Sequence, residues 1–486
     1  MTFLLGGANS ASGGYEVSNS LRFDGSSSFL RDTLGTPTSQ KKFTFSCWAK
    51  GYFQRSGSVG SRLCSAGANG DAHYTGILNM VRTNGTPQIY ISDSAGKYVN
   101  FNNTFLRDPS AWYHFVVAID TTQGTATNRT KLYINGTQLS NTVASHEEQP
   151  TENYDWPTLA SGQLITIGAN SQSDASFYDG YMADVHFIDG QAKAPTDFGE
   201  FDNSGIWKPI EYAGTFGNNG FKLEFKQTGT STNSSGIGAD TSGNDIHLAV
   251  TGLAATDVTV DTPTNNFATM NPVHVSSYGS AALPTFSEGN LKIGMNSDSS
   301  TSSTIAPSKG KWYVEYKQGE NTADNQGYPI VGISATLGGT GGDVIGFRTP
   351  SGTDYRGQLG TTSVSNAFGS ARSADDIFGF YINLDDDILI VHKNGSDYMG
   401  SGASSGLDWS GGLTTTNEQT GFYHFYVQNN SDGSPRYTDE VNFGNPTFSI
   451  SSSNSDANGY GSFEYSPTLS GTAFYAMCTK NLAEFG

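Results

Sequence analysis

Charged side chains are scarce in this chain, at 15% of 486 residues, and basic ones are the scarcer kind. The formal net charge of −19 comes without any cluster of Lys and Arg, which binding to nucleic acid or anionic lipid requires. Long apolar runs are missing as well, since none approaches the roughly 18 residues of a membrane-spanning helix. The sequence therefore predicts no nucleic-acid partner and no membrane insertion.

Cysteine is nearly absent. Cys47, Cys64 and Cys478 are too few and too scattered for a disulfide framework or a zinc site, which needs closely paired ligands. Cys47 lies in an alternating stretch and is predicted to be a buried free thiol. The first residues lack a basic n-region and a full hydrophobic region, so we expect no signal peptide and synthesis in a cytoplasm.

Glycine and aromatic residues dominate instead, with 60 Gly, 29 Phe and 24 Tyr. This mixture disfavours helices and favours short strands joined by turns. Apolar and polar residues alternate at 43–48 and 311–316, as half-buried strands require. Asn135-Gly136 and Asn394-Gly395 are typical of tight hairpin turns. We predict an all-β chain of two tandem antiparallel β-sandwich (jelly-roll) domains.

Composition divides the chain into five parts. We predict an N-terminal arm at 1–18, a sandwich at 19–226, a linker and long loop at 227–285, a second sandwich at 286–450, and a C-terminal tail at 451–486 that packs on a domain or a neighbour. The linker assignment rests on a stretch almost free of apolar residues, which cannot form a core.

Candidate catalytic residues are few. Glycoside hydrolysis needs two acids held ~5–10 Å apart. Glu200 and Asp202 would share one face of a strand, but Ser204 stands where a third acid would complete the motif. Residues 402–406 match the nucleophile-elbow pattern but lie in a Gly/Ser-rich stretch with no helix after it. We therefore predict no catalytic residues and a protein that is not an enzyme.

Metal ligands are no better supported. Residues 240–245 begin like a calcium loop, but Asp245 and Thr251 replace the required Gly and Glu, so a polar turn is the preferred interpretation. Residues 385–387 are interpreted as a charged hairpin turn. Four histidines in predicted strands are expected to be packed side chains: His114, His186, His392 and His424. No metal or cofactor is predicted, and a structural calcium ion has no support in the sequence.

Motifs at residues 21–25, 43–48, 112–114, 132–136, 165–168 and 179–185 resemble those of laminin-G-like, concanavalin-A-like lectin domains. That family usually has an acidic pair in the last of these strands. Ala183 replaces its first member here, which weakens the transfer of a cation or glycan site to Asp184. Motifs at 310–315, 331–333, 392–395 and 441–444 resemble those of SPRY domains, which implies partner binding through loops and no enzymatic activity.

Longer phrases at 1–10, 182–192, 205–209 and 263–269 make most of the chain similar to structural proteins of tailed phages of marine bacteria. The resemblance implies a location on the virion surface, as a tail or head fibre or spike. It implies other virion proteins and host-surface glycan as partners, and a homo-oligomer, trimeric as in many phage fibres. Virion anchoring is expected of the apolar N-terminal tip, Phe3, Leu4, Leu5, Gly6 and Gly7.

Two alternatives stay open. One is a capsid decoration protein with a purely structural role. The other is a polysaccharide-degrading enzyme, which the missing third acid disfavours.

Overall fold

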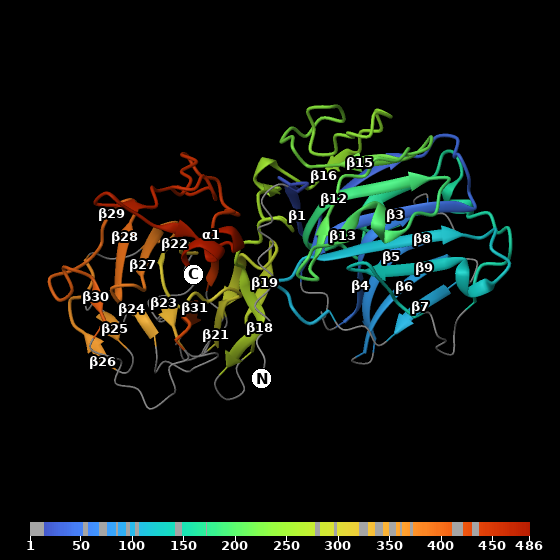
Figure 1. Ribbon diagram of the computed structural model, residues 1–486. Helices are drawn as coiled ribbons and strands as arrows, with labels where there is room; N and C mark the ends of the chain where they lie inside the picture. The colour runs from blue at the N-terminus through green and yellow to red at the C-terminus, as the bar shows by residue number, and fades with distance from the viewer. Residues whose placement is uncertain are drawn as a thin grey trace. The chain divides into compact units, whose positions relative to one another are not determined.

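A computed structural model of the chain describes residues 14–486, except 52–56, 68–74, 84–85, 94–97, 103–105, 141–147, 172, 278–281, 296–298, 320–328, 336–343, 349–355, 360–361, 370–372, 411–420 and 430–436. The described part forms two compact units, residues 14–264 and residues 265–486, called here the first and second unit (Figure 1). Each is described by itself.

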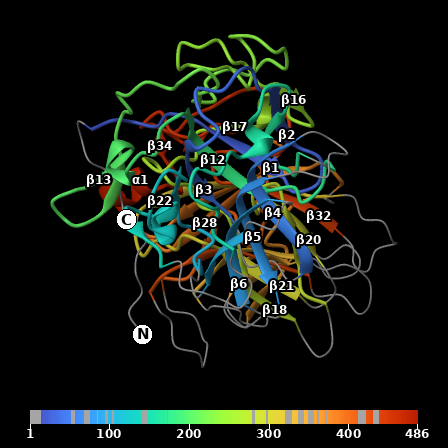
Figure 2. The ribbon, with the colours of Figure 1, turned by 90° about the vertical axis from the view of Figure 1, so that its right-hand side faces the viewer.

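The first unit is a sandwich of two antiparallel sheets. The sheet around β3 has the order β10 (Thr137–Gln138), β9 (Thr130–Ile134), β8 (Tyr113–Asp120), β3 (Lys42–Lys50), β12 (Asp179–Asp189), β1 (Ser20–Asp24) and β17 (Val258–Thr259), with β15 (Phe221–Leu223) also paired to β12. The sheet around β4 has the order β16 (Ala249–Thr251), β2 (Phe29–Thr33), β11 (Leu164–Ile167), β4 (Gly57–Ala66), β5 (Thr75–Thr83), β6 (Thr86–Asp93) and β7 (Tyr98–Asn102). Figure 2 shows β4, β5 and β6 side by side.

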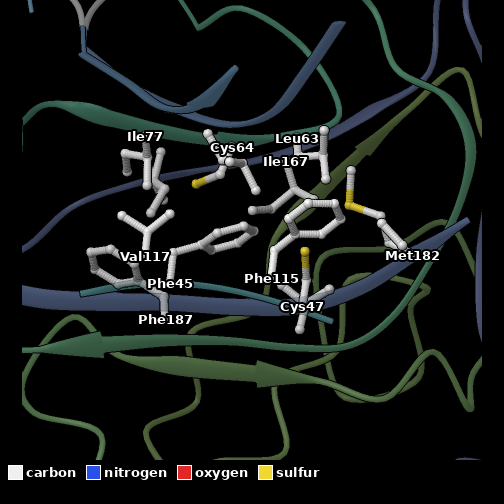
Figure 3. Packing of buried hydrophobic residues seen from close by; sticks show 14 of the residues in the cluster. Phe45, Cys47, Leu63, Cys64, Ile77, Phe115, Val117, Ile167, Met182 and Phe187 are labelled. Atoms are coloured by element: carbon white, nitrogen blue, oxygen red, sulfur yellow. The ribbon is translucent and has the colours of Figure 1, made fainter. Parts of the chain in front are cut away.

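The core of the first unit lies between these two sheets. Phe45 and Cys47 of the β3 sheet and Leu63 and Cys64 of the β4 sheet are fully buried in it (Figure 3). Cys47 is a free thiol, as predicted, and burial alone raises its pKa well above the usual range.

The other face of the β3 sheet is also buried. Residues 195–216 cover it with the 3₁₀ turn Pro195–Asp197, the hairpin of β13 (Gly199–Phe201) and β14 (Trp207–Pro209), and the loop after this hairpin. For this reason β3 is buried along nearly its whole length instead of at alternate positions. The first unit also contains four 3₁₀ turns: Ala126–Asn128, Pro157–Leu159, Pro195–Asp197 and Ala255–Asp257.

The second unit is again a sandwich. One sheet has the order β18 (Met270–Ser277), β21 (Ser299–Ser303), β31 (His424–Asn429), β23 (Pro329–Ser334), β24 (Val344–Arg348), β25 (Arg356–Leu359) and β26 (Thr362–Val364). The other has the order β19 (Thr285–Ser287), β20 (Lys292–Met295), β32 (Tyr437–Asn442), β22 (Lys311–Lys317), β27 (Ile377–Asn383), β28 (Ile388–Lys393) and β29 (Ser396–Asp397), with β30 (Leu407–Asp408) on β28 and β35 (Tyr475–Ala476) on β22. The hairpin β33 (Thr468–Leu469) and β34 (Thr472–Ala473) and the helix α1 (Thr479–Phe485) complete the unit.

The predicted all-β class and its hairpins are confirmed. Asn135 and Gly136 have φ of 47° and 78°, and Asn394 and Gly395 have φ of 50° and 77°, the left-handed values that such turns need. Within the described ranges no helix is long and apolar enough to cross a membrane.

The boundaries differ from the expected ones at three places. The part of the expected linker and long loop from residue 265 on belongs to the second unit, where β18 pairs with β21. Residues 227–264, assigned to a linker, are part of the first unit: Ile237, Leu248 and Leu253 are buried in its core, and β16 and β17 pair with its sheets. Local composition hid this because the few apolar residues are widely spaced and find partners far away. Val17, assigned to the arm, is also buried in the first unit.

Candidate functional site

Aromatic and polar side chains pack together between the β3 sheet and the covering residues 195–216. Trp48 stacks on His114, with ring centroids 4.9 Å apart, and His114 stacks on Trp207 at 6.0 Å. The Trp207 indole N–H donates to His114 Nδ1 at 3.1 Å. His114 Nε2 lies 2.9 Å from Ser46 Oγ. The indole donor requires Nδ1 to be unprotonated, so His114 is a neutral imidazole that donates from Nε2.

Burial lowers the pKa of His114 to about 3, with a smaller effect from His186. His186 lies in the same group of side chains, with its Nδ1 3.0 Å from the Asp184 carbonyl oxygen, and burial lowers its pKa too. In the second unit, His424 Nδ1 lies 2.9 Å from the Ser303 carbonyl oxygen, and His392 packs edge-on against Tyr381. All four histidines are thus packed side chains, as predicted.

Asp184 occupies the position at which the lectin resemblance suggested a site. It lies at a β-bulge in β12 with φ of 48°, and its side chain is 3% exposed. The Tyr15 hydroxyl donates to Asp184 Oδ1 at 3.1 Å, and Lys222 Nζ lies 4.0 Å from the same oxygen. Tyr15 therefore covers the carboxylate of Asp184. This carboxylate binds the N-terminal segment of the first unit and does not face solvent.

The acidic turns found in the sequence accept hydrogen bonds from nearby backbone N–H groups. Asp240 accepts hydrogen bonds from the backbone N–H groups of Lys222, Ser242 and Ile246, so the predicted polar turn is confirmed. Asp385 accepts from the Gly310 N–H at 2.8 Å in the turn between β27 and β28. Among the described residues, no three His, Cys, Asp or Glu side chains are grouped as a metal site would need.

The two catalytic candidates have structural roles. Glu200 pairs with Lys208 at 3.1 Å across the β13–β14 hairpin. Asp202 accepts from the N–H groups of Ser204 and Ile206 at 2.8 and 2.9 Å and so closes the turn of that hairpin. Residues 402–406 form turns that lead directly into the strand β30, where the nucleophile-elbow motif would need a helix.

One aromatic ring on the first unit is presented to solvent. Phe201 is 56% exposed and lies edge-on against Trp207, with centroids 4.9 Å apart. Trp207 is itself fixed, because a Cβ on Gly136 or Gly199 would lie only 2.5 Å from its ring. Phe201 is therefore an exposed aromatic surface on a rigid support, bordered by the polar groups of the same hairpin. The sequence pattern singles out only the acids on either side of it, Glu200 and Asp202.

Comparison with known proteins decides the fold of the first unit. Residues 24–195 match the model of the family described as Concanavalin A-like lectin/glucanases superfamily. The first unit has a concanavalin A-like fold. No curated protein sequence matches the chain.

Three solved structures are similar to parts of the chain. A heptameric SAP-like pentraxin from Limulus polyphemus is 17% identical, over 37% of this chain and 80% of its own, with a TM-score of 0.27. The SPRY domain of human HERC1 is 10% identical, over 35% and 96%, with a TM-score of 0.25. Tailspike protein 2 of the Escherichia coli O157:H7 bacteriophage CAB120 is 12% identical, over 37% and 24%, with a TM-score of 0.25. Similarities this distant say nothing about ligands, and the SPRY assignment of the second unit stays a prediction.

The expected anchoring residues Phe3, Leu4, Leu5, Gly6 and Gly7 lie outside the described residues. Their role stays a prediction.

Proposed function

We propose that this chain is a non-enzymatic glycan-binding protein displayed on the surface of a phage particle, where it assembles with other virion proteins as a homo-oligomer. The observation that carries the glycan-binding part is the match of residues 24–195 to a superfamily named for its lectins. The exposed ring of Phe201 supports it, because aromatic rings offer an apolar face to the C–H groups of a sugar while neighbouring polar groups bind its hydroxyls.

Phe201→Ala is expected to weaken binding about tenfold, which is about 1.4 kcal/mol, since that is the scale of one aromatic contact. Glycans selected from an array of bacterial surface polysaccharides with the full chain are titrated against wild type and variant by calorimetry. Phe422→Ala, which removes an aromatic ring that is 45% exposed in the second unit, is the matched control and should leave the affinity unchanged. Equal affinities for wild type and Phe201→Ala would remove the hairpin from the site, and an array without any saturable binding would contradict glycan binding itself.

The virion part is tested by deleting residues 1–13, which stops short of the buried Val17 and leaves the first unit whole. We expect the truncated chain to fold and to be missing from purified particles, as judged by quantitative immunoblotting beside wild type. Normal incorporation of the truncated chain would contradict an anchoring role for Phe3 to Gly7.

A polysaccharide-cleaving activity is the second candidate, because the matched superfamily also includes glucanases. Release of reducing ends from the bound polysaccharide by the purified chain would favour it over simple binding.

A further inference from the structure

A lysine and an aspartate are buried together in the first unit, and the aspartate lies close to the last residue of this unit in the sequence. Lys50, the last residue of β3, and Asp261 each have a side chain that is 1% exposed, and Lys50 Nζ lies 2.7 Å from Asp261 Oδ2. The two residues are 211 positions apart in the chain. The free energy needed to remove two charges from water exceeds the stabilisation that an ordinary surface ion pair provides. Such a buried pair therefore needs a further explanation.

Aromatic groups enclose the pair. The Trp112 indole N–H donates to Asp261 Oδ1 at 3.1 Å, and Lys50 Nζ lies 5.6 Å from the centre of the Tyr181 ring. Both backbones are fixed as well: the Tyr178 hydroxyl donates to the Lys50 carbonyl at 2.9 Å, and the Ser20 hydroxyl donates to the Asp261 carbonyl at 2.6 Å.

The Lys50 ammonium is easier to deprotonate here than on the surface. Burial lowers the pKa of Lys50, although the charges of Asp261 and of the nearby Asp108 oppose the shift. A lysine in such a dry site loses its proton more easily than an exposed lysine, and the neutral amine is a nucleophile.

We propose that Lys50 and Asp261 join in an intramolecular isopeptide bond that cross-links the first unit. A proton passes from the Lys50 ammonium to Asp261 Oδ2, which gives a free amine and a carboxylic acid. The amine nitrogen attacks Cγ, the Cγ–Oδ2 bond breaks, and Oδ2 takes one further proton from the nitrogen and leaves as water. Oδ1 remains as the amide oxygen and keeps the hydrogen bond from Trp112, which also polarises the carbonyl during attack. No oxidant, metal or co-substrate is needed.

Position and burial together favour the reaction. Well-oriented intramolecular groups reach effective concentrations on the order of 10⁵ M or more, and the product replaces two buried charges by one neutral amide. The bond would link β3 to the end of the unit and close the intervening chain into a ring. Force applied to the two ends of the chain could then no longer extend that segment.

The test is the intact mass of the denatured full-length protein. We expect wild type to be lighter than its sequence by one water molecule. After trypsin digestion, the peptide that contains Lys50 should be uncleaved at that residue and joined to the peptide that contains Asp261. Lys50→Met and Asp261→Ala should each restore the full sequence mass. Lys208→Met, which removes a lysine from a surface ion pair with Glu200, should keep the deficit.

Because the bond can form only in the folded chain, the variants count only if their circular dichroism spectrum before denaturation matches that of wild type, and the cross-linked tryptic peptide of wild type tests the bond without any variant. A wild-type mass equal to that of the sequence would overturn the proposal. So would a deficit that persists in Lys50→Met, since the water would then have been lost elsewhere.

Discussion

Replacing Glu315 by alanine is expected to lower the free energy of unfolding of the second unit by about 3–5 kcal/mol. Glu315 lies on the face of β22 that the C-terminal segment covers, and it is fully buried. Its carboxylate accepts hydrogen bonds from the backbone N–H groups of Glu464 and Tyr465, at 3.0 and 2.8 Å. It accepts a third from the side-chain amide of Asn442, at 2.9 Å. Truncation would leave these donors buried without their acceptor.

Urea unfolding, with hydrogen exchange of the β22 and β27 amides as the probe, measures the change in the free energy of unfolding. Asp375→Asn, which neutralises an acid that is 76% exposed beside Lys317, is the control and should change stability by no more than about 0.5 kcal/mol. A similar small change for Glu315→Ala would show that the C-terminal segment does not depend on this carboxylate. The tail predicted at 451–486 lies on the second unit through these contacts and through the parallel pairing of β35 with β22.

Phe45→Ala is expected to destabilise the first unit by about 3–5 kcal/mol, because it removes a fully buried ring and leaves a cavity between the two sheets. Phe45 lies on β3 and faces the core between Val117 and Phe187, its partners on the two neighbouring strands (Figure 3). The midpoint and slope of denaturant unfolding give the change.

Two controls separate the cavity from the loss of an aromatic ring as such. Phe45→Leu keeps most of the volume and should cost clearly less. Phe201→Ala removes an exposed ring from the same unit and should leave stability within about 0.5 kcal/mol of wild type. Equal losses for Phe45→Ala and Phe201→Ala would contradict the described core.

The candidate site was much less predictable than the fold. Glu200 and Asp202 drew attention because acids two residues apart share a strand face, yet the structure uses one in an ion pair and the other in a turn. Phe201 between them carried no signal, because a strand pattern does not show which aromatic residue will lack a covering neighbour. Its exposure depends on where the hairpin lies on the β3 sheet.

The strands, the hairpin turns and the all-β class could be predicted from local amino-acid patterns. These features depend on residues close together in the sequence. Side chains alternate between the two faces of a strand, and an Asn-Gly pair such as Asn135-Gly136 readily adopts the positive φ of a tight turn. Three features depend on long-range packing: residues 227–264 complete the first sandwich, Glu315 binds a segment 149 residues away, and Lys50 pairs with Asp261. Local patterns do not reveal these contacts, because the partners are far apart in the chain and a buried polar group binds whichever partner the fold brings to it.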